Sequence, residues 1–259
     1  MRRKIAVVSL LIVLIALLTG CSNINQPINQ QSPGIWSHYF VYPLSEFIIY
    51  MAHLFGNSYG MSIIVATLIV RLVLLPLMAK QVKSSKAMQE LQPRIKALQE
   101  KYSSKDQKTM KKLQEEQMKL FQEEHVNPLA GCLPILIQMP ILFAFYQAIM
   151  RTKEIKTQSF LWFQLGSPDP YYILPILAAL TTFLQQKIMM GRIGNTNPQM
   201  AMMMYVFPVM IAFMAVAFPS ALALYWVVGN IFMIFQTYII YEKKDDGKEK
   251  ADTGGARKR

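Results

Sequence analysis

Five blocks of about twenty apolar residues dominate this sequence and limit the folds open to it. They cover residues 60–79, 129–150, 171–190, 200–218 and 221–241, and none contains Asp or Glu. A helix needs about 20 apolar residues to cross the hydrocarbon of a bilayer. Apolar residues make up 53% of the chain and charged residues only 16%. The pattern predicts an all-α integral membrane protein with five transmembrane helices.

The first residues, MRRKIAVVSLLIVLIALLTGC, have a basic start followed by an apolar stretch. This order is typical of a secretory signal peptide. The ending Leu18-Thr19-Gly20-Cys21 resembles a bacterial lipobox, which implies cleavage before Cys21 and attachment of lipid to that cysteine. The alternative is an uncleaved first helix with an incidental cysteine. We expect residues 1–20 to be a lipoprotein signal peptide.

The distribution of basic residues predicts the orientation of the helices. Residues 22–57 contain no Lys or Arg, whereas segment 80–127 contains 11 and the tail 242–259 contains seven. Basic loops stay in the cytoplasm, so we expect the N-terminus outside and the C-terminus inside. The net charge of +12 then reflects membrane topology and predicts no direct nucleic-acid specificity. Three basic residues in segment 151–170 fit this orientation poorly: Arg151, Lys153 and Lys156.

The chain divides into four parts by composition. We expect the signal peptide 1–20, an extracellular N-terminal segment 21–57, a core 58–241 that includes a cytoplasmic hairpin 80–127, and a basic disordered tail 242–259. The aromatic-rich stretch 36–55 within the second part predicts an amphipathic helix on the outer membrane surface. The tail has seven basic and five acidic residues and no apolar period, which is typical of disorder.

Two helical patterns lie in the charged segment between the first and second apolar blocks. Their core positions are spaced three and four residues apart: Met88, Leu91, Ile95 and Leu98, then Met110, Leu113, Gln117 and Leu120. The polar break YSSKDQ at 102–107 suits a turn. We expect an antiparallel helical hairpin with narrow apolar seams. It is either a solvated helical pair or a docking arm for the membrane surface or a partner.

Arg71 is the one charged residue in the apolar run from Gly60 to Ala79. It lies about 2 Å from the middle of that run along the helix axis, too deep for its side chain to reach water at either end. A buried guanidinium needs a partner or water, and no predicted span supplies a carboxylate. Polar side chains, backbone carbonyls, water or an acid from another molecule are the remaining options.

Neutral polar residues occur at comparable depth in other spans. Gln138, Gln185 and Trp226 lie in the second, third and fifth blocks, and Thr67 lies one helical turn from Arg71. Taken alone, each such residue often serves only to hydrogen-bond one helix to another. Together with an uncompensated arginine they indicate a water-filled cavity that opens toward the cytoplasm.

At these residues the sequence resembles the YidC family of membrane protein insertases. The stretches that carry the resemblance are RLVLLPLMAKQVKSSKAMQELQPRIKALQEKY (71–102), NPLAGCLPILIQMPILFAFYQA (127–148), MMMYVFPVM (202–210) and PSALALYWVVGNIFMIFQ (219–236). It is strongest for the Gram-positive lipoprotein members, including the Bacillus paralogue of sporulation stage III. The resemblance implies a five-helix bundle around an inward-open hydrophilic groove, with groove residues at Arg71, Gln138, Gln185 and Trp226.

The resemblance also implies a function and partners. We expect a non-enzymatic insertase and chaperone without a cofactor or metal, which acts on nascent membrane proteins and contacts the ribosome and membrane lipids. Action beside the Sec translocon, the substrates, the oligomeric state and a sporulation role stay open. The alternative is a secondary transporter or channel for a small anion that binds at Arg71. Against it, no span holds an ionisable partner for proton coupling.

Overall fold

The computed structural model describes residues 26–103, 106–126, 133–193 and 198–255. These residues are predominantly helical, as predicted, and include one two-stranded hairpin. The elements in chain order are the π-helix η2 (Ser37–Val41), α2 (Tyr42–Leu54), α3 (Tyr59–Glu90), α4 (Gln92–Lys101), α5 (Gln107–Glu123), α6 (Leu133–Arg151), α7 (Lys153–Lys156), β1 (Ser159–Phe160), β2 (Phe163–Gln164), α8 (Ile173–Ile193), α9 (Pro198–Ala217) and α10 (Ser220–Gly255).

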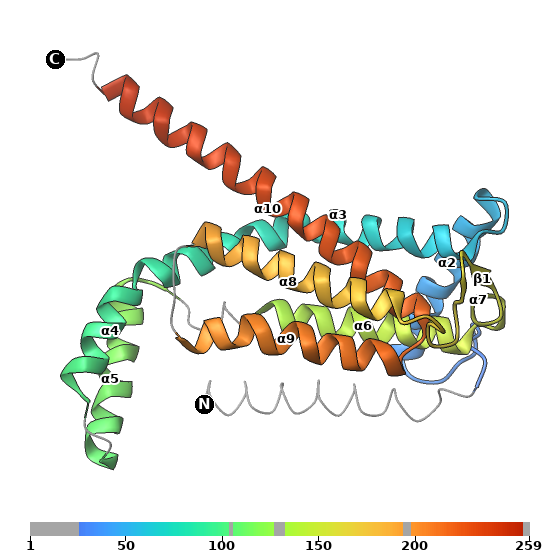
Figure 1. Ribbon diagram of the computed structural model, residues 1–259, viewed down its shortest axis with the longest axis horizontal. Helices are drawn as coiled ribbons and strands as arrows, with labels where there is room; N and C mark the ends of the chain where they lie inside the picture. Colours follow the sequence, from blue (N-terminus) through green and yellow to red (C-terminus); the bar gives the residue numbers. More distant parts are fainter. Residues whose placement is uncertain (1–25, 104–105, 127–132, 194–197, 256–259) are drawn as a thin grey trace.

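The long apolar helices pack together into a bundle (Figure 1). Helix α10 contacts α3, α6, α8 and α9, and α8 also packs along α9. Within the described residues, three segments are long and apolar enough to cross a membrane: Tyr59–Lys80, Ile173–Met190 and Ser220–Ile239. Two shorter apolar helices, Leu136–Arg151 and Met204–Ala217, belong to α6 and α9. The prediction of membrane-spanning helices is therefore confirmed for three segments, while the count of five stays a prediction.

Helix α3 carries the hairpin away from the bundle, because its apolar first part continues without a break into a charged second part (Figure 1). The hairpin consists of α4 and α5, whose contact is centred on Leu91, Ile95 and Leu120. An ion pair between Arg94 and Glu124 lies beside this contact. The predicted helical pair is therefore present. Its seam is closed only near the bundle, since Met110 at the far end is 46% exposed.

The N-terminal segment forms a helix that packs on the bundle. η2 and α2 together cover most of the predicted stretch 36–55 and contact α3 and α6. Val41, Ile48 and Ala52 are fully buried on one face. Tyr39 and Tyr50 are 67% and 62% exposed. Aliphatic groups thus face inward and the two tyrosines face outward, as suits a helix between a bundle and a membrane interface.

Helix α10 continues to Gly255, whereas the sequence predicts disorder from residue 242. Extending a helix that already exists requires no new nucleation step, and the segment is rich in Lys, Glu and Asp. The predicted signal peptide 1–20 and the lipidation site Cys21 lie outside the described residues.

Candidate substrate site around Arg71

Arg71 is buried in the bundle, and its partners are neutral. The residue is 8% exposed. Its Nη2 atom donates a hydrogen bond to Gln138 Oε1 on α6 at 3.2 Å, and Nη1 donates to Met233 Sδ on α10 at 3.4 Å. Among the residues that the structure describes, Arg71 forms no ion pair. The guanidinium is therefore hydrogen-bonded but has no opposite charge paired with it among these residues.

Gln138 links the arginine to a buried tyrosine. Its Nε2 atom donates to Tyr225 Oη on α10 at 2.6 Å. Tyr225 is 1% exposed, and its ring stacks on Phe145 of α6 with centroids 4.4 Å apart. The stacked ring fixes the hydroxyl, which in turn orients the glutamine amide. Arg71, Gln138 and Tyr225 thus form a chain of hydrogen bonds across α3, α6 and α10, which we call the arginine cluster.

The face of α10 that meets Arg71 repeats every four residues. Tyr225, Gly229 and Met233 follow this spacing, which places them on one side of a helix. A methyl group at position 229 would lie 2.7 Å from Arg71 Nη2. The guanidinium therefore rests against the bare backbone of Gly229. Sequence reasoning missed Gly229 and Met233, although the four-residue spacing from Tyr225 was a usable signal.

A second polar cluster lies on the adjacent face of α10. Trp226 Nε1 donates to Thr182 Oγ1 of α8 at 3.1 Å. With its amide oxygen turned toward these donors, Asn230 accepts hydrogen bonds from Thr182 Oγ1 at 2.8 Å and from Trp226 Nε1 at 3.2 Å. Asn230 is buried, as is Thr182. These contacts attach α10 to α8, as interhelical polar groups do in membranes.

The predicted groove residues therefore do not all contact one another. Arg71 and Gln138 are in direct contact, while Trp226 belongs to the second polar cluster. Gln185 Nε2 donates to Met189 Sδ at 3.6 Å, one turn along α8. Thr67 is fully buried on the same helix as Arg71, but its hydroxyl donates to its own backbone, at Ile63 O. The shared groove role of these residues stays a prediction.

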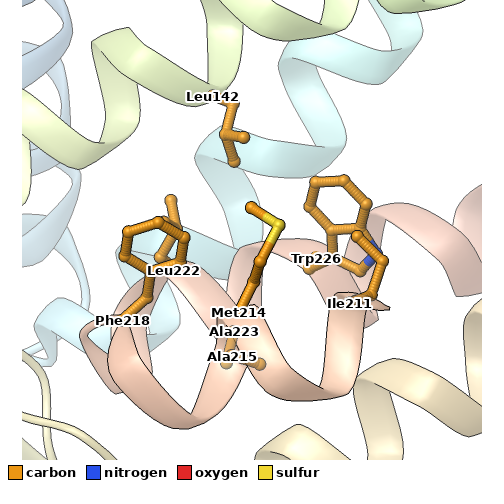
Figure 2. Close-up of a pocket in the computed structure, with 8 residues that line it drawn as sticks. All are labelled: Leu142, Ile211, Met214, Ala215, Phe218, Leu222, Ala223 and Trp226. Atoms are coloured by element: carbon orange, nitrogen blue, oxygen red, sulfur yellow. The ribbon is translucent and has the colours of Figure 1, made fainter. Parts of the chain in front are cut away.

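An apolar pocket borders Trp226. Figure 2 shows side chains from α6, α9 and α10 that converge on it, with Leu142 pointing toward Met214. The pocket holds about 30 Å³ of space, roughly one water molecule. Its walls are Leu142, Ile211, Met214, Ala215, Phe218, Leu222, Ala223 and Trp226. Trp226 thus contacts α8 through its ring nitrogen and also lines an apolar space between α6 and α9.

A second buried arginine, Arg151, ends α6. It is 4% exposed. Its Nε atom donates to the backbone oxygen of Gln26 at 3.0 Å, and Nη1 donates to Ser37 Oγ at 2.9 Å and to Gln147 Oε1 at 3.3 Å. By its position in the sequence, Arg151 is expected to be a loop charge. In the structure it is instead a fixed internal group that holds the N-terminal segment against the bundle.

Comparisons with known proteins agree on one family. The family described as "60Kd inner membrane protein" matches residues 50–248. The chain is 60% identical to "Membrane protein insertase YidC 2" of Bacillus anthracis over 240 residues, which cover 93% of this chain and 94% of that one. It is 57% identical to "Membrane protein insertase MisCA" of Bacillus subtilis (strain 168), over 100% of this chain and 99% of the relative.

A solved structure supports the same assignment. The structure titled "Active YidC insertase crystal structure with the first transmembrane domain resolved" is 30% identical and superposes with a TM-score of 0.61. The match covers 80% of this chain and 47% of the solved one, so this chain spans about half of that protein. Both the sequence match and the shared fold identify the chain as a member of the 60Kd inner membrane protein family, which includes the YidC insertases.

Proposed function

We propose that this chain inserts newly made membrane proteins into the cell membrane, with Arg71 as the group that receives polar or acidic exported segments. Relatives named as membrane protein insertases match almost the whole chain. The observation that carries the role of Arg71 is a buried guanidinium whose hydrogen-bond acceptors are an amide oxygen and a thioether sulfur. An acidic residue on another molecule is a stronger acceptor for this group than either.

The orientation that we propose has five membrane spans, with the N-terminus outside and the hairpin 80–127 and the C-terminus in the cytoplasm. The buried state of Arg151 supports it, because this residue is bonded inside the protein and is not a free loop charge. The outer loop then keeps Lys153 and Lys156, against 11 basic residues in the hairpin segment. The positive-inside rule favours this arrangement.

The mechanism follows from two opposing energies. A polar exported segment resists entry into hydrocarbon, and a path lined by Arg71, Gln138, Gln185 and Trp226 shortens the apolar distance it must cross. A charged substrate group near Arg71 gains Coulomb energy in the low-dielectric interior. The adjacent apolar span gains roughly 25 cal/mol for each Å² that it buries in lipid. That gain exceeds a single ion pair once a span of some twenty residues is transferred, so the substrate leaves the site sideways.

The proposed partners follow from the same orientation. Nascent membrane proteins are the substrates, and ribosomes approach from the side that carries the basic hairpin. The exposed aromatic residues Tyr39 of η2 and Tyr50 of α2 suit contact with lipid headgroups. Whether the Sec translocon takes part is a separate question, which insertion into liposomes that lack it would answer.

Insertion into reconstituted liposomes tests the role of Arg71. We would compare a single-span substrate with acidic exported residues against the same substrate with these residues changed to Asn or Gln. We expect Arg71→Ala to reduce insertion of the acidic version by about tenfold and of the neutral version much less. Arg71→Lys should retain part of the activity, because it keeps the charge without the planar fork. Equal losses for both substrates would overturn the charge-attraction role.

A further inference from the structure

We propose that Gln138 is a displaceable resting acceptor: its amide oxygen occupies the position that a substrate carboxylate takes beside Arg71. This inference rests on the proposed function of Arg71 and adds a regulation of that site. It is drawn from the arginine cluster, where Gln138 contacts both Arg71 and Tyr225. Before substrate binds, Arg71 is hydrogen-bonded to Gln138, but no carboxylate of the described residues pairs with it.

Gln138 occupies the acceptor position on Arg71 that a substrate carboxylate would take. Arg71 Nη2 directs a hydrogen toward Gln138 Oε1 at 3.2 Å. The arginine is only 8% exposed, so an incoming carboxylate reaches this nitrogen by replacing the amide oxygen. The other partner, Met233 Sδ, is a weak acceptor that offers little competition. Gln138 is therefore the group that holds Arg71 until substrate arrives.

The relative strengths of the two contacts allow the exchange. Hydrogen bonds in which the donor or the acceptor is ionised are roughly twice as strong as those between neutral groups, and Arg–carboxylate pairs often form two such bonds. A carboxylate also adds Coulomb attraction to the guanidinium that the neutral amide oxygen lacks, so the carboxylate displaces the amide. A carboxylate at position 138 itself would form a lasting ion pair with Arg71, and breaking that pair would leave two buried charges uncompensated. The neutral amide of Gln138 forms no ion pair with Arg71, so it can be displaced without leaving a second buried charge.

Tyr225 explains why the amide returns after the substrate leaves. The Gln138 Nε2 atom has two hydrogens, and one is donated to the buried Tyr225 hydroxyl at 2.6 Å. This anchor does not involve Arg71, so it survives the exchange. Within the part of the chain that the structure describes, the second hydrogen has no recorded acceptor, so it can donate to the incoming carboxylate. The glutamine thus stays beside the site, and its oxygen rebinds Arg71 when the carboxylate departs.

Two substitutions at position 138 give opposite rankings under the two explanations of this residue. Gln138→Glu places a permanent carboxylate beside Arg71, and Gln138→Met is an unbranched apolar replacement of similar length. If Gln138 is a displaceable acceptor, Glu should reduce insertion of the acidic substrate by about tenfold, and Met, which removes the competing oxygen, should raise the ratio of acidic to neutral substrate inserted. If Gln138 only makes the wall polar, Met should reduce insertion of both substrates equally and leave that ratio unchanged, and Glu should be tolerated.

The experiment uses the full-length protein in liposomes, with the acidic and neutralised substrates described above. Each variant is first checked for the wild-type elution volume and melting temperature in detergent. If Gln138→Glu fails this check, Gln138→Met alone still decides, because an unchanged ratio of acidic to neutral substrate inserted would contradict displacement. Arg71→Ala measured in parallel separates the two proposals. An acid-dependent loss with Arg71→Ala together with full activity of Gln138→Glu would overturn only the displacement inference.

Discussion

Gly229 on α10 lies directly against the guanidinium of Arg71 on α3. A methyl group at position 229 would approach Nη2 to 2.7 Å, Nε to 3.2 Å and Cζ to 3.3 Å. Glycine inside a helix costs about 1 kcal/mol relative to alanine. Because α10 carries this cost at the point of contact, the close approach of the charged group is the physical reason for a residue without a side chain there.

We predict that Gly229→Ala displaces the guanidinium of Arg71 and leaves the helix bundle intact. The atom that a methyl group would approach most closely, Nη2, is also the donor to Gln138. It is the end of a flexible side chain, so it can move while the helices stay in place. We expect several-fold weaker insertion of the acidic substrate, with an unchanged or slightly higher melting temperature because alanine favours the helix.

A double-mutant comparison checks the cause of this loss. In an Arg71→Ala background there is no guanidinium to displace, so adding Gly229→Ala should reduce insertion no further. Independent sites give additive losses, whereas residues in contact do not. Additive losses would mean that position 229 acts through helix packing and not through Arg71.

We predict that Asp169 stabilises the start of α8. Its buried carboxylate accepts hydrogen bonds from Leu174 N at 2.7 Å, from Tyr171 N at 3.1 Å and from Trp162 Nε1 at 3.1 Å. Asp169→Ala leaves these donors without an acceptor, which costs about 1–3 kcal/mol for a buried group. Thermal unfolding in detergent should show a lower midpoint, and Trp162 fluorescence should change.

The exposed cap of α5 provides a control for Asp169. Asp106 also accepts from a backbone amide, Thr109 N at 3.1 Å, but it lies on the hairpin outside the bundle. Asp106→Ala should weaken α5 locally and leave the main unfolding midpoint unchanged. A similar shift for both variants would show that helix capping in general, and not the position of Asp169, sets the stability.

The sequence was sufficient to place most helices, because apolar runs of membrane length and a three-four spacing are local patterns. It also indicated that no predicted span offers Arg71 a carboxylate partner. It did not show how α10 is rotated against its neighbours. That rotation directs Tyr225 and Gly229 toward Arg71 and directs Trp226 toward Thr182. Such facing depends on packing among all helices, which no single segment encodes.

Arg151 supports a prediction about the N-terminal segment. Its three hydrogen bonds join Gln26, Ser37 and Gln147. Arg151→Ala should release residues 26–37 from the bundle, and limited proteolysis with mass spectrometry should show faster cleavage there. Arg151→Lys should give an intermediate rate, because an ammonium group lacks the planar fork that reaches these acceptors together. Unchanged cleavage in the alanine variant would show that other contacts hold the segment.

Cys21, the predicted lipidation site, lies five residues before Gln26 in the sequence. An extended chain of five residues spans at most about 18 Å. Since Arg151 holds Gln26 at the end of α6, lipid on Cys21 must enter the bilayer close to the bundle. We expect mass spectrometry of the purified protein to show a mature terminus at Cys21 with attached diacylglycerol. Cys21→Ala should block this processing but change insertion little, because the Arg151 contacts still hold the segment. An intact Met1 terminus on the wild-type protein would contradict the lipoprotein assignment.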